Sequence, residues 1–577
     1  MSRTRFGALV AATMLVVAAC GGSTATTAPS AAESAAPTSA ASTAASAPAS
    51  QAAAVKEGGT LVVGLNGDMV LADPSLISDS NSSYVMNNVV QGLVGLKPGT
   101  ISDVVPVLAA SMPTVSADGL TYTFTLRQGI KFHDGTDFNA DAVVYNYMRQ
   151  LNAPSALQND YNYYFGAVFN GFGADSNLAS VTAPDENTVV FKLKTPQSNF
   201  LLATSIVNFG IQSPTALKAG DADNPDPSKS PYAQGQGGTG KSMVGTGPFM
   251  FKEWVPNDHI TLVKNPNYWD PAGAAHLDAI TFRPLADPTA TLNALQAGDI
   301  DFAQTISPND VATVKGDSSL QVIDRGASCN ELHLSLNNAM KPFDNLQIRQ
   351  AIGYALNKQP YIDAFYAGLA NIADNFMPPS TEYYKPLNLP TYDPQKAKDL
   401  IASSGVPASE LNLTFYYPSD VVRPYMPDPK GIAEAIATDL EAVGFNITFQ
   451  TEGWRTGYLT DVNAGKLPMY LLGWTCDWAG PDNFLVTDLF YFDGNKPNPQ
   501  FSYGPADLKA AFDAGIAATT DSAAQTAWDQ AQDILARDLP IIPILNSKPP
   551  AAATAAMKGF VGAGNLTEAF NTVWLDR

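Results

Sequence analysis

The stretch LNLTFYYPSDVVRPYMPDPKGIAEAIATDLEAVGFNITFQ, residues 411–450, decides the fold class. Apolar and aromatic residues from Leu413 to Tyr417 predict a strand, and a proline-rich loop separates it from a helical pattern that ends at Gly444. The apolar stripe of that helix is formed by Ile432, Ile436, Leu440 and Val443. A second strand follows at residues 447–449. Strand, helix and strand in this order predict an α/β domain.

The same alternation continues on both sides of this stretch. Upstream, a helix is expected to begin at Asp393-Pro394 and to end at Gly405, in keeping with the preference for proline at a helix start and glycine after its end. Downstream, residues 469–473 predict a buried strand, and residues 522–536 predict a helix before a last apolar strand. The second half of the chain is therefore expected to be an α/β domain.

The first half carries weaker signals of the same kind. Residues 60–63 predict a strand, and the alternating run at residues 122–126 predicts another. Asn139 is placed to cap a helix that starts directly after it. Apolar residues between 86 and 94 recur at helical spacing and predict a further helix.

The first residues predict export from the cell. Arg3 and Arg5 form a short basic region, and residues 6–19 are small or mostly apolar, without a charge, in a run too short to span a bilayer comfortably. Residues 1–19 are therefore expected to be a signal peptide. The small residues before Cys20 resemble the bacterial lipobox, at which the signal is cleaved and the cysteine becomes lipid-modified. An ordinary signal followed by a chance cysteine is the alternative.

A tether is expected after the signal, with the lipidated cysteine and a disordered linker at residues 20–56. Residues 21–54 consist almost entirely of Gly, Ser, Thr, Ala and Pro, and Glu33 is their only charge, so they cannot bury enough apolar area to fold. A flexible coil of this length spans about 30 Å. No later stretch is long and apolar enough to cross a membrane. The lipid is thus expected to anchor the folded part to the outer face of the cytoplasmic membrane.

Composition narrows the class of partner. The net charge of −21 argues against nucleic acid or anionic lipid. The part after the linker is long enough for at least two domains.

Only Cys329 and Cys476 remain after Cys20, and in an exported protein these two can form one disulfide or stay free.

One motif imitates a nucleotide-binding site. GQGGTGKS, residues 235–242, matches the phosphate-loop pattern, but that site needs a strand before it and a helix after it, and neither is expected here. The four histidines are widely spaced, and no CxxC, HExxH or GxSxG pattern appears. The sequence therefore indicates a surface loop and gives no sign of a metal, a cofactor or a catalytic residue. A catalytic triad assembled from distant parts of the chain stays open.

Two charges stand just past predicted strand ends. Asp477 lies between Trp474 and Trp478 in GWTCDWAGPDNF, and a carboxylate between indoles is costly unless a cation meets it. Arg423 follows the strand that opens the fold-deciding stretch. In open α/β sheets, ligands bind at the carboxyl ends of the strands. For Arg423, a solvated loop position or a salt bridge to Asp420 is the alternative.

Five segments resemble the peptide-binding family of bacterial solute-binding proteins, also called extracellular solute-binding proteins of family 5, which deliver ligands to ABC importers. The segments are GLVGLKPG (92–99), TYTFTLRQGIKFHDGTDFNADAVVYNY (121–147), GTGPFMFKEWVPNDHITLVKNPNYWD (245–270), LNALQAGDIDF (292–302) and FDNLQIRQAIGYALNKQPYI (343–362). The likeness runs in order from about residue 58 to the C-terminus. RPYMPDPKGIAEA and GWTCDWAGPDNF most resemble dipeptide-binding members.

The resemblance implies a two-lobed α/β fold of the periplasmic-binding-protein type, with a hinge and an extra subdomain inserted in the first lobe. Lobe 1 is expected at residues 57–305, with the insertion at about 98–184. Lobe 2 is expected at 306–545, and residues 546–577 are expected to return to lobe 1. Ligand is enclosed between the lobes in this family.

The resemblance also implies roles for the two charges. In dipeptide-binding members, an aspartate at the position of Asp477 binds the α-ammonium group of the ligand, and an arginine at the position of Arg423 binds its α-carboxylate. Both ends of a zwitterion are then satisfied, because arginine offers a planar fork to a carboxylate. Trp474 and Trp478 are expected to shield this arrangement and line the side-chain pocket, with core packing as the alternative for each.

Two weaker expectations concern neighbouring positions. Ser82 and Ser83 lie near a first-lobe segment that contacts ligand in relatives. Relatives commonly have a small residue where Cys476 stands, and pairing with Cys329 would stiffen the second lobe beside the site.

The function implied is that of a lipid-anchored, non-enzymatic receptor. It is expected to act as a monomer that captures a short peptide and presents it to the transmembrane permease subunits of an ABC importer, without a cofactor or nucleic acid. Alternatives keep the fold and change the ligand to an oligopeptide, an oligosaccharide, a nickel complex or haem, and the few histidines count against direct nickel ligation. An exported hydrolase and a ligand sensor are alternatives from other classes.

Overall fold

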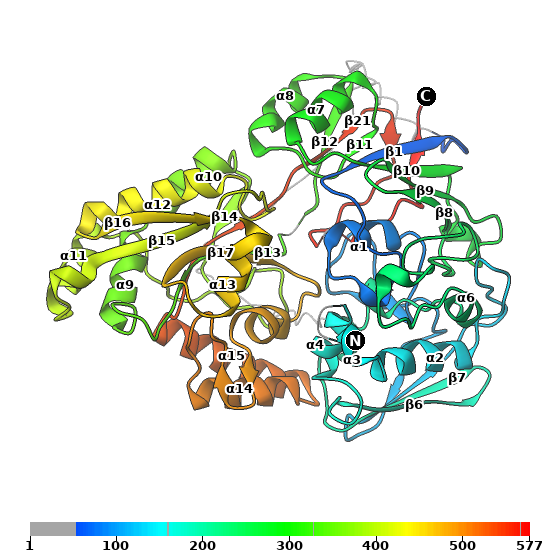
Figure 1. Cartoon of the computed structure of the whole chain (residues 1–577), viewed down its shortest axis with the longest axis horizontal. Coiled ribbons are helices and arrows are strands. Elements are labelled where there is room, and N and C mark those ends of the chain that lie inside the picture. Colours follow the sequence, from blue (N-terminus) through cyan, green and yellow to red (C-terminus); the bar gives the residue numbers. More distant parts are fainter. Residues whose placement is uncertain (1–53, 159–160, 327, 566) are drawn as a thin grey trace, which may run out of the picture. The chain divides into compact units, whose positions relative to one another are not determined.

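The computed structural model describes residues 54–158, 161–326, 328–565 and 567–577. The expected signal peptide, Cys20 and nearly all of the expected linker lie outside the described residues. Residues 55–577 form one compact unit (Figure 1). Within the described part of the chain, no helix combines the length and the apolar character needed to cross a membrane.

The first lobe is built on a mixed seven-stranded sheet. Its strands, in order across the sheet, are β12 (Leu320–Ile323), β21 (Ala551–Thr554), β11 (Phe302–Ala303), β1 (Thr60–Leu65), β10 (Ala279–Pro284), β9 (His259–Lys264) and β8 (Phe249–Val255). β1 pairs in parallel with β10 and β11, and the other pairs are antiparallel. Because parallel strands end at the same edge, β1, β10 and β11 present their carboxyl ends together.

The second lobe is built on a mixed six-stranded sheet. Its order is β14 (Ala370–Ile372), β20 (Ile542–Ser547), β13 (Asn330–Leu336), β17 (Met469–Thr475), β15 (Asn412–Pro418) and β16 (Asn446–Glu452). β15 pairs in parallel with β16 and β17, whereas β13 runs antiparallel to β17. The strands predicted within the fold-deciding stretch are therefore confirmed as neighbours, and three carboxyl ends share one edge.

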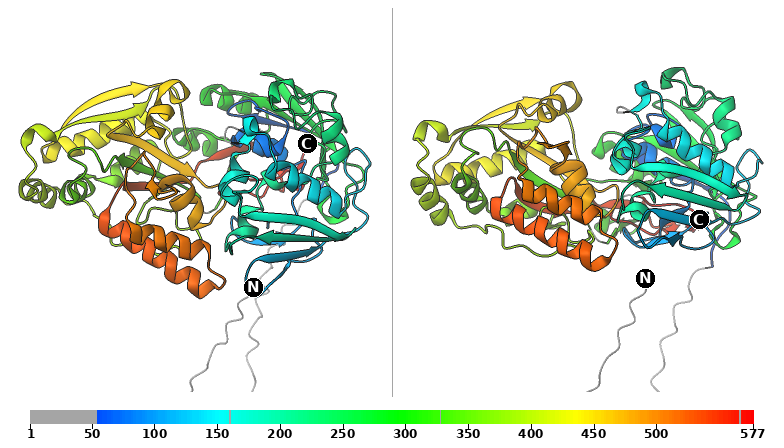
Figure 2. Two further views of the ribbon diagram at one scale, coloured as in Figure 1. Left: turned by 60° about the horizontal axis from the view of Figure 1, so that its bottom comes forward. Right: turned by 90° about the horizontal axis from the view of Figure 1, so that it is seen from below.

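The helices cover these sheets and pack against one another. They are α1 (Ser80–Met86), α2 (Ala140–Leu151), α3 (Ser155–Gln158), α4 (Tyr163–Phe169), α5 (Phe200–Ala203), α6 (Pro214–Ala219), α7 (Pro288–Ala297), α8 (Val311–Gly316), α9 (Leu346–Ala355), α10 (Lys358–Phe365), α11 (Pro394–Ser403), α12 (Pro429–Val443), α13 (Leu459–Asn463), α14 (Ala506–Ile516) and α15 (Asp521–Asp538). α14 and α15 pack side by side along one flank of the second lobe (Figure 2). Two π-helical segments, Trp454–Tyr458 and Asn483–Leu489, follow β16 and β17.

α12 shows why the sequence prediction succeeds in this lobe. The side chain of Asp428 accepts from the backbone N–H of Gly431, and Pro429 occupies the first turn, where its missing N–H costs nothing. The predicted stripe, Ile432 through Val443, is buried. Gly444 ends the helix with φ of 113°, a conformation that a side chain disfavours. The predicted stripe and the predicted stop are short-range signals, and both are confirmed.

The helix predicted between residues 86 and 94 is wrong. α1 ends at Met86, and the chain passes through turns at residues 87–89 before it reaches β2 (Val94–Leu96). The reason is tertiary, because the carbonyl of Val89 accepts from the backbone N–H of Gly247, and a Cβ at Gly245 would lie 2.2 Å from that same carbonyl. The apolar residues of this segment are buried against a neighbouring segment and not along one helix face.

The inserted subdomain has a sheet of its own. Its strands, in order, are β4 (Thr114–Val115), β5 (Thr121–Thr125), β7 (Thr188–Leu193) and β6 (Leu178–Asp185). The sheet thus extends to Leu193, past the expected end near residue 184. Three further strand pairs are short, namely β2 with β3 (Val104–Pro106), β18 (Phe492–Asp493) with β19 (Lys496–Pro497), and β22 (Met557–Lys558) with β23 (Trp574–Leu575).

The chain crosses between the lobes later than the sequence indicates. β12 belongs to the first sheet, because Val322 pairs with Ala552 of β21. The crossing therefore lies between β12 and β13, so the expected boundary near residue 305 falls inside the first lobe. The return lies between β20 and β21, after Ser547, a few residues past the expected position at 545.

Candidate functional site

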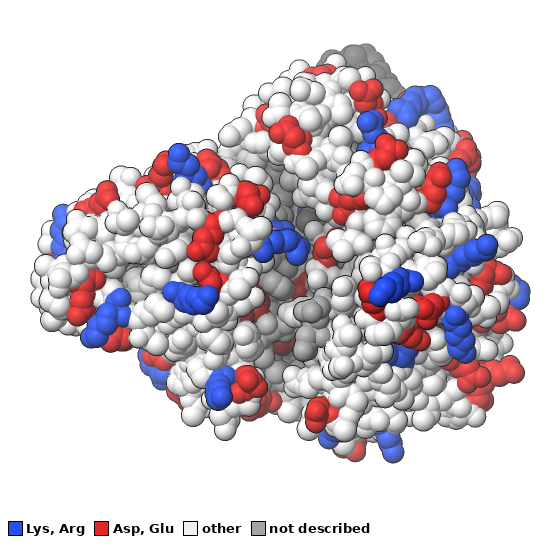
Figure 3. Space-filling view, viewed as in Figure 1, with Lys and Arg blue, Asp and Glu red and all other residues white. Residues whose placement is uncertain are grey.

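A cavity of about 2450 Å³ is lined by both lobes. Lobe 1 contributes the segments that follow β1, β10 and β11, and lobe 2 contributes those that follow β15, β16 and β17. Figure 3 shows the surface hollowed there, with charged side chains near the opening. Both sheets thus turn the carboxyl ends of their parallel strands toward one space, which is where open α/β sheets bind ligands.

Asp477, directly past β17, has only neutral partners. Its Oδ1 accepts from the Tyr164 hydroxyl of α4 at 2.6 Å, and its Oδ2 accepts from Asn483 Nδ2 at 3.1 Å. Burial raises the pKa of Asp477 to about 6, while these two hydrogen bonds act in the opposite direction. In the described part of the chain, no lysine or arginine lies within 4.0 Å of this carboxylate.

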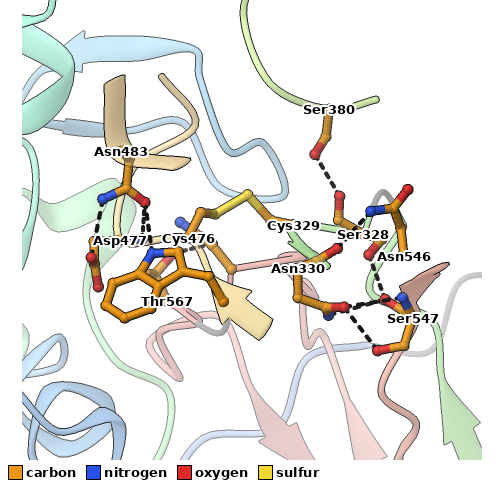
Figure 4. The surroundings of a disulfide bond; sticks show 12 residues. Ser328, Cys329, Asn330, Ser380, Cys476, Asp477, Asn483, Asn546, Ser547 and Thr567 are labelled. Carbon is orange, nitrogen blue, oxygen red and sulfur yellow. Dashed lines mark hydrogen bonds between the residues drawn. A yellow bond between two sulfur atoms is a disulfide. The ribbon is translucent and has the colours of Figure 1, made fainter. Parts of the chain in front are cut away.

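Asn483 holds the surroundings of Asp477 in place. Its Oδ1 accepts from the backbone N–H of Asp477 at 3.1 Å and from Trp474 Nε1 at 3.2 Å. Figure 4 shows Asn483 beside Asp477, with both of their hydrogen bonds in view. Trp474 lines the cavity, as predicted. One amide side chain therefore orients both the carboxylate and the indole.

Arg423 lies past β15 in a tight turn. Its backbone N–H donates to the carbonyl of Met426 at 3.1 Å, and the Met426 N–H donates back at 2.9 Å. The guanidinium carbon sits 4.7 Å from the ring centre of Trp454, a cation–π contact, and Nε is buried without an acceptor. The salt bridge to Asp420 does not form, because Asp420 instead accepts from the backbone N–H of Trp454.

Close packing forms the floor between the two charges. A Cβ at Gly473 would lie 2.2 Å from the carbonyl oxygen of Glu331 and 2.6 Å from the ring of Tyr425. Only glycine allows β13, β17 and the Tyr425 ring to approach this closely. Tyr425 follows Arg423 by two residues, so this packing fixes the turn that carries the arginine.

A disulfide joins Cys329 and Cys476 beside the site, with the two Cα atoms 5.6 Å apart. The backbone N–H of Cys476 also donates to the carbonyl of Cys329 at 2.8 Å, so the bond extends the β13–β17 ladder by one step. Figure 4 shows this bond between Asp477 on one side and Asn330 on the other. The residue next to Asp477 is thereby tied to the segment through which the chain enters lobe 2.

Two residues that were predicted to contact the ligand, Ser82 and Trp478, do not line the cavity. Ser82 is fully buried, and its Oγ accepts from the backbone N–H of Val70. Its neighbour Ser83 does line the cavity, because consecutive helical residues point about 100° apart. Trp478 is 1% exposed and packs into an apolar core that is otherwise formed by lobe 1 residues 93–244. Of the two readings for Trp478, the structure shows core packing.

Several residues of the site were missed by sequence reasoning. Tyr164 has no local signal, since it meets Asp477 across 313 residues. Trp454 and Arg455 follow β16, and the parallel pairing of β15 and β16 could have pointed to them. Asn483 lies in the stretch GWTCDWAGPDNF, the same stretch that contains Asp477.

The remaining candidate motifs supply no chemistry. Residues 235–242 form turns, with no strand directly before them and no helix directly after them. Within the described chain, no group of three or more His, Cys, Asp and Glu side chains could hold a metal ion. All four histidines are described, and none lines the cavity. The cavity wall combines the buried carboxylate of Asp477, the guanidinium groups of Arg423 and Arg455, and aromatic side chains.

Comparison with known sequences gives two kinds of match. The profile of the bacterial extracellular solute-binding proteins, family 5 middle, matches residues 103–496. The chain is 31% identical over 520 residues to heme-binding protein A of Haemophilus influenzae, which covers 87% of this chain and 90% of that protein. It is 33% identical over 457 residues to di/tripeptide-binding protein 1 of Pseudomonas aeruginosa, with coverage of 77% and 81%.

A solved structure matches as well. The ABC transporter-associated periplasmic binding protein DppA from Helicobacter pylori, in complex with the peptide STSA, superposes with a TM-score of 0.74 at 28% identity. The match covers 90% of this chain and 99% of that one. The predicted two-lobed α/β fold is thereby confirmed.

Proposed function

Since the chain belongs to family 5 of the bacterial extracellular solute-binding proteins, we propose that it captures short, dipeptide-like zwitterions between its lobes and delivers them to the membrane permease of an ABC importer. Asp477 binds the ligand's α-ammonium group, and Arg423 binds its α-carboxylate. Trp474 and Ser83 line the same cavity beside them.

The observation that carries this proposal is that neither charge forms an ion pair with any residue that the structure describes. Asp477 is held by neutral donors, and the Nε of Arg423 is buried without an acceptor. A desolvated charge without a partner costs free energy. A zwitterion satisfies both, because its ammonium pairs with the carboxylate and its carboxylate accepts from the guanidinium fork.

Two fixed charges also measure ligand length. Each added residue lengthens an extended peptide by about 3.3–3.6 Å, so a clamp matched to one length excludes others unless the peptide folds back. Enclosure of the ligand is a shift of population toward the closed arrangement of the lobes, driven by contacts that both lobes make only there. We therefore expect a short peptide to bind in preference to a long one.

Attachment and delivery belong to the same proposal. The sequence motif at Cys20 and the linker after it support a lipid anchor on the outer face of the cytoplasmic membrane. Delivery to a permease is supported by the Helicobacter pylori structure, which is named as ABC transporter-associated. The protein acts as a monomer and without catalysis, in line with the relatives, which are named as binding proteins.

Haem is the second candidate ligand. The Haemophilus influenzae relative is named as heme-binding, and the cavity of about 2450 Å³ exceeds the roughly 300–1,000 Å³ of common ligand pockets. The cavity lining argues against haem, because all four histidines are among the described residues and none of them lines the cavity. The two opposite charges, Asp477 and Arg423, favour a zwitterion as the ligand.

Calorimetry on the whole chain separates these ligands. Alanyl-alanine, a pentapeptide, cellobiose and haem are titrated in turn, and we expect the dipeptide to bind and the pentapeptide to bind more weakly. Binding of haem or cellobiose without any peptide binding would overturn the proposal. Hydrolysis of the dipeptide on prolonged incubation would instead indicate an enzyme.

Arg423 is tested by changing protein and ligand together. Arg423→Gln is expected to weaken the binding of the dipeptide strongly. The binding of the C-terminal dipeptide amide, which is already weak, should not change, because the amide has no carboxylate for Arg423 to bind. Arg423→Lys is expected to restore little, since an ammonium lacks the planar fork. Equal losses for acid and amide would show that Arg423 does not hold the carboxylate.

A further inference from the structure

Asp488 is another acidic side chain that lines the same cavity. It lies in the π-helical segment Asn483–Leu489, which begins with the residue that orients Asp477. Its Oδ2 is buried, and none of the described residues donates a hydrogen bond to it. π-Helical turns are rare and are found frequently at functional sites. This carboxyl group therefore sits in the cavity wall with one oxygen unsatisfied.

The groups that face Asp488 are mostly acidic or neutral. From β13 comes Glu331, which is fully buried, and whose Oε1 pairs with His333 Nδ1 at 2.7 Å while Oε2 has no partner. From the end of β17 comes Asp477. Tyr163 of α4, Tyr425 and Tyr491 complete the surroundings.

Strand register explains how Glu331 comes to face this segment. Glu331 pairs directly with Trp474 across the antiparallel β13–β17 ladder, so both side chains leave the sheet on the same face. Trp474 on that face contacts Asn483, the first residue of the π-helical segment. The π-helical segment therefore lies over Glu331, and its Asp488 interacts with that carboxylate.

Together these residues concentrate negative charge at one end of the cavity. Burial, and then the charges of Glu331 and Asp477, raise the pKa of Asp488 well above its usual range. Tyr163 interacts with both Asp477 and Asp488, so it lies within reach of the two acids. Arg423 interacts electrostatically with Tyr425, and within the described residues it forms no ion pair with any of these acids.

Resting on the proposed capture of zwitterions, we propose that Asp488 is a second ammonium site, which binds the side-chain amine of a lysine-like residue at the N-terminus of the peptide. The α-ammonium at Asp477 places the first side chain of the ligand nearest to Asp488. Glu331 is buried beside Asp488, and its Oε2, which has no hydrogen-bond partner among the described residues, strengthens the attraction for a cation. A metal ion is the poorer occupant, because the described side chains offer no cluster of three metal ligands.

Binding of such a side chain is coupled to proton release. Burial and the neighbouring acids favour the protonated form of Asp488, whereas an alkylammonium group beside it favours the ionised carboxylate, so binding releases protons from Asp488 to solvent. The ion pair that forms contains no covalent step. A peptide without the side-chain amine does not favour the ionised carboxylate and releases fewer protons.

Two peptides of matched shape test the inference on the whole chain. Lysyl-alanine and norleucyl-alanine differ only in the terminal amine of the first side chain. Calorimetry is expected to show lysyl-alanine binding at least tenfold more tightly. Asp488→Asn should reduce this ratio to below threefold and leave norleucyl-alanine within threefold of its original affinity. Asp493→Asn, an exposed acid five residues further on, is the matched control and should keep the full ratio.

Proton release gives a readout that needs no variant. Titrations in two buffers of different ionisation enthalpy are expected to show more proton release on binding of lysyl-alanine than on binding of norleucyl-alanine. Equal affinities and equal proton release for the two peptides would overturn the second site and leave the proposed function standing. Failure of both peptides to bind would overturn the proposed function itself.

Discussion

At the scale of the residue, Asp477 is the carboxylate that we propose binds the ligand's ammonium group, and neutral side chains fix its position. Tyr164 and Asn483 each donate a hydrogen bond to its carboxylate, but neither carries a charge. Neutral donors offset only part of the desolvation cost, which is why the pKa of Asp477 stays raised, at about 6. The geometry of the carboxylate is therefore set before any ligand arrives, while its charge remains to be neutralised.

Removal of this charge should weaken binding by a defined amount. Asp477→Asn is expected to cost about 2–5 kcal/mol of dipeptide affinity, as expected for losing one partner of a buried charge pair. Calorimetry with an N-acetylated dipeptide completes the comparison, since that ligand has no ammonium and should bind the original protein and the variant equally weakly. Asp493→Asn is the matched control, and unchanged affinity in Asp477→Asn would show that the ammonium binds elsewhere.

The pH dependence of binding should report the same group. Ligand ammonium requires the ionised carboxylate, so affinity is full well above pH 6 and falls as pH drops through the pKa of Asp477 in the empty protein. Between pH 7 and pH 5 we expect a loss of about tenfold, measured with a dipeptide whose side chains do not titrate. The Asp477→Asn variant should show a flat profile over this range, and a profile as steep as that of the original protein would assign the titration to another group.

At the scale of the element, the site is a product of strand direction. β15, β16 and β17 run in parallel, so the residues that follow them meet at one edge, and these residues include Arg423, Trp454 and Asp477. β13 pairs with β17 in antiparallel orientation, and the disulfide from Cys329 to Cys476 lies at the end of this ladder. The position of Asp477 is thus supported by backbone pairing and by a covalent link at once.

Loss of the disulfide should affect stability more than binding. Cys329→Ser combined with Cys476→Ser is expected to lower the free energy of unfolding by about 2–5 kcal/mol, because the bond closes a long loop in the unfolded chain. Dipeptide affinity should change by less than threefold, because the N–H of Cys476 still donates to Cys329. Chemical denaturation with and without reductant measures the effect, and the double variant should not respond to reductant. A large loss of affinity at unchanged stability would contradict this assignment.

At the scale of the whole molecule, the lobes meet around the cavity as well as through the chain crossings. Trp478, which belongs to lobe 2 by sequence, packs into the apolar core of lobe 1, and its Nε1 donates to Asp482, which in turn accepts from Asn199 of lobe 1. These side-chain contacts join the two lobes beside the cavity, in addition to the crossings of the chain.

Trp478 should therefore control affinity without touching ligand. Trp478→Ala removes a core contact of the kind that costs about 3–5 kcal/mol, so the empty protein is expected to open, with a larger radius of gyration by small-angle scattering and weaker dipeptide binding. Trp528→Ala is the control, because Trp528 is equally buried but lies within the core of lobe 2. It should lower stability and leave the radius unchanged. An unchanged radius in Trp478→Ala would contradict the role of this contact.

Sequence alone determined the elements whose signals are local. The stripe of α12 and the stop at Gly444 lie within one helix, and the strands of lobe 2 follow from apolar runs, so the order of these elements along the chain could be predicted without the fold. Arg423 and Asp477 could be placed past strand ends for the same reason. The roles expected for these two residues came from the family resemblance, because the local sequence does not indicate which ligand a charged side chain binds.

Only the tertiary structure decided which side chains share a space. It turned Ser82 inward and Ser83 outward, docked Trp478 on the other lobe, and kept β12 in the first sheet beside β21. It also brought Tyr164 to Asp477 and left Asp488 without a partner. These outcomes depend on contacts between residues far apart in the chain, and the free energies of such contacts exist only once both segments have been folded against each other.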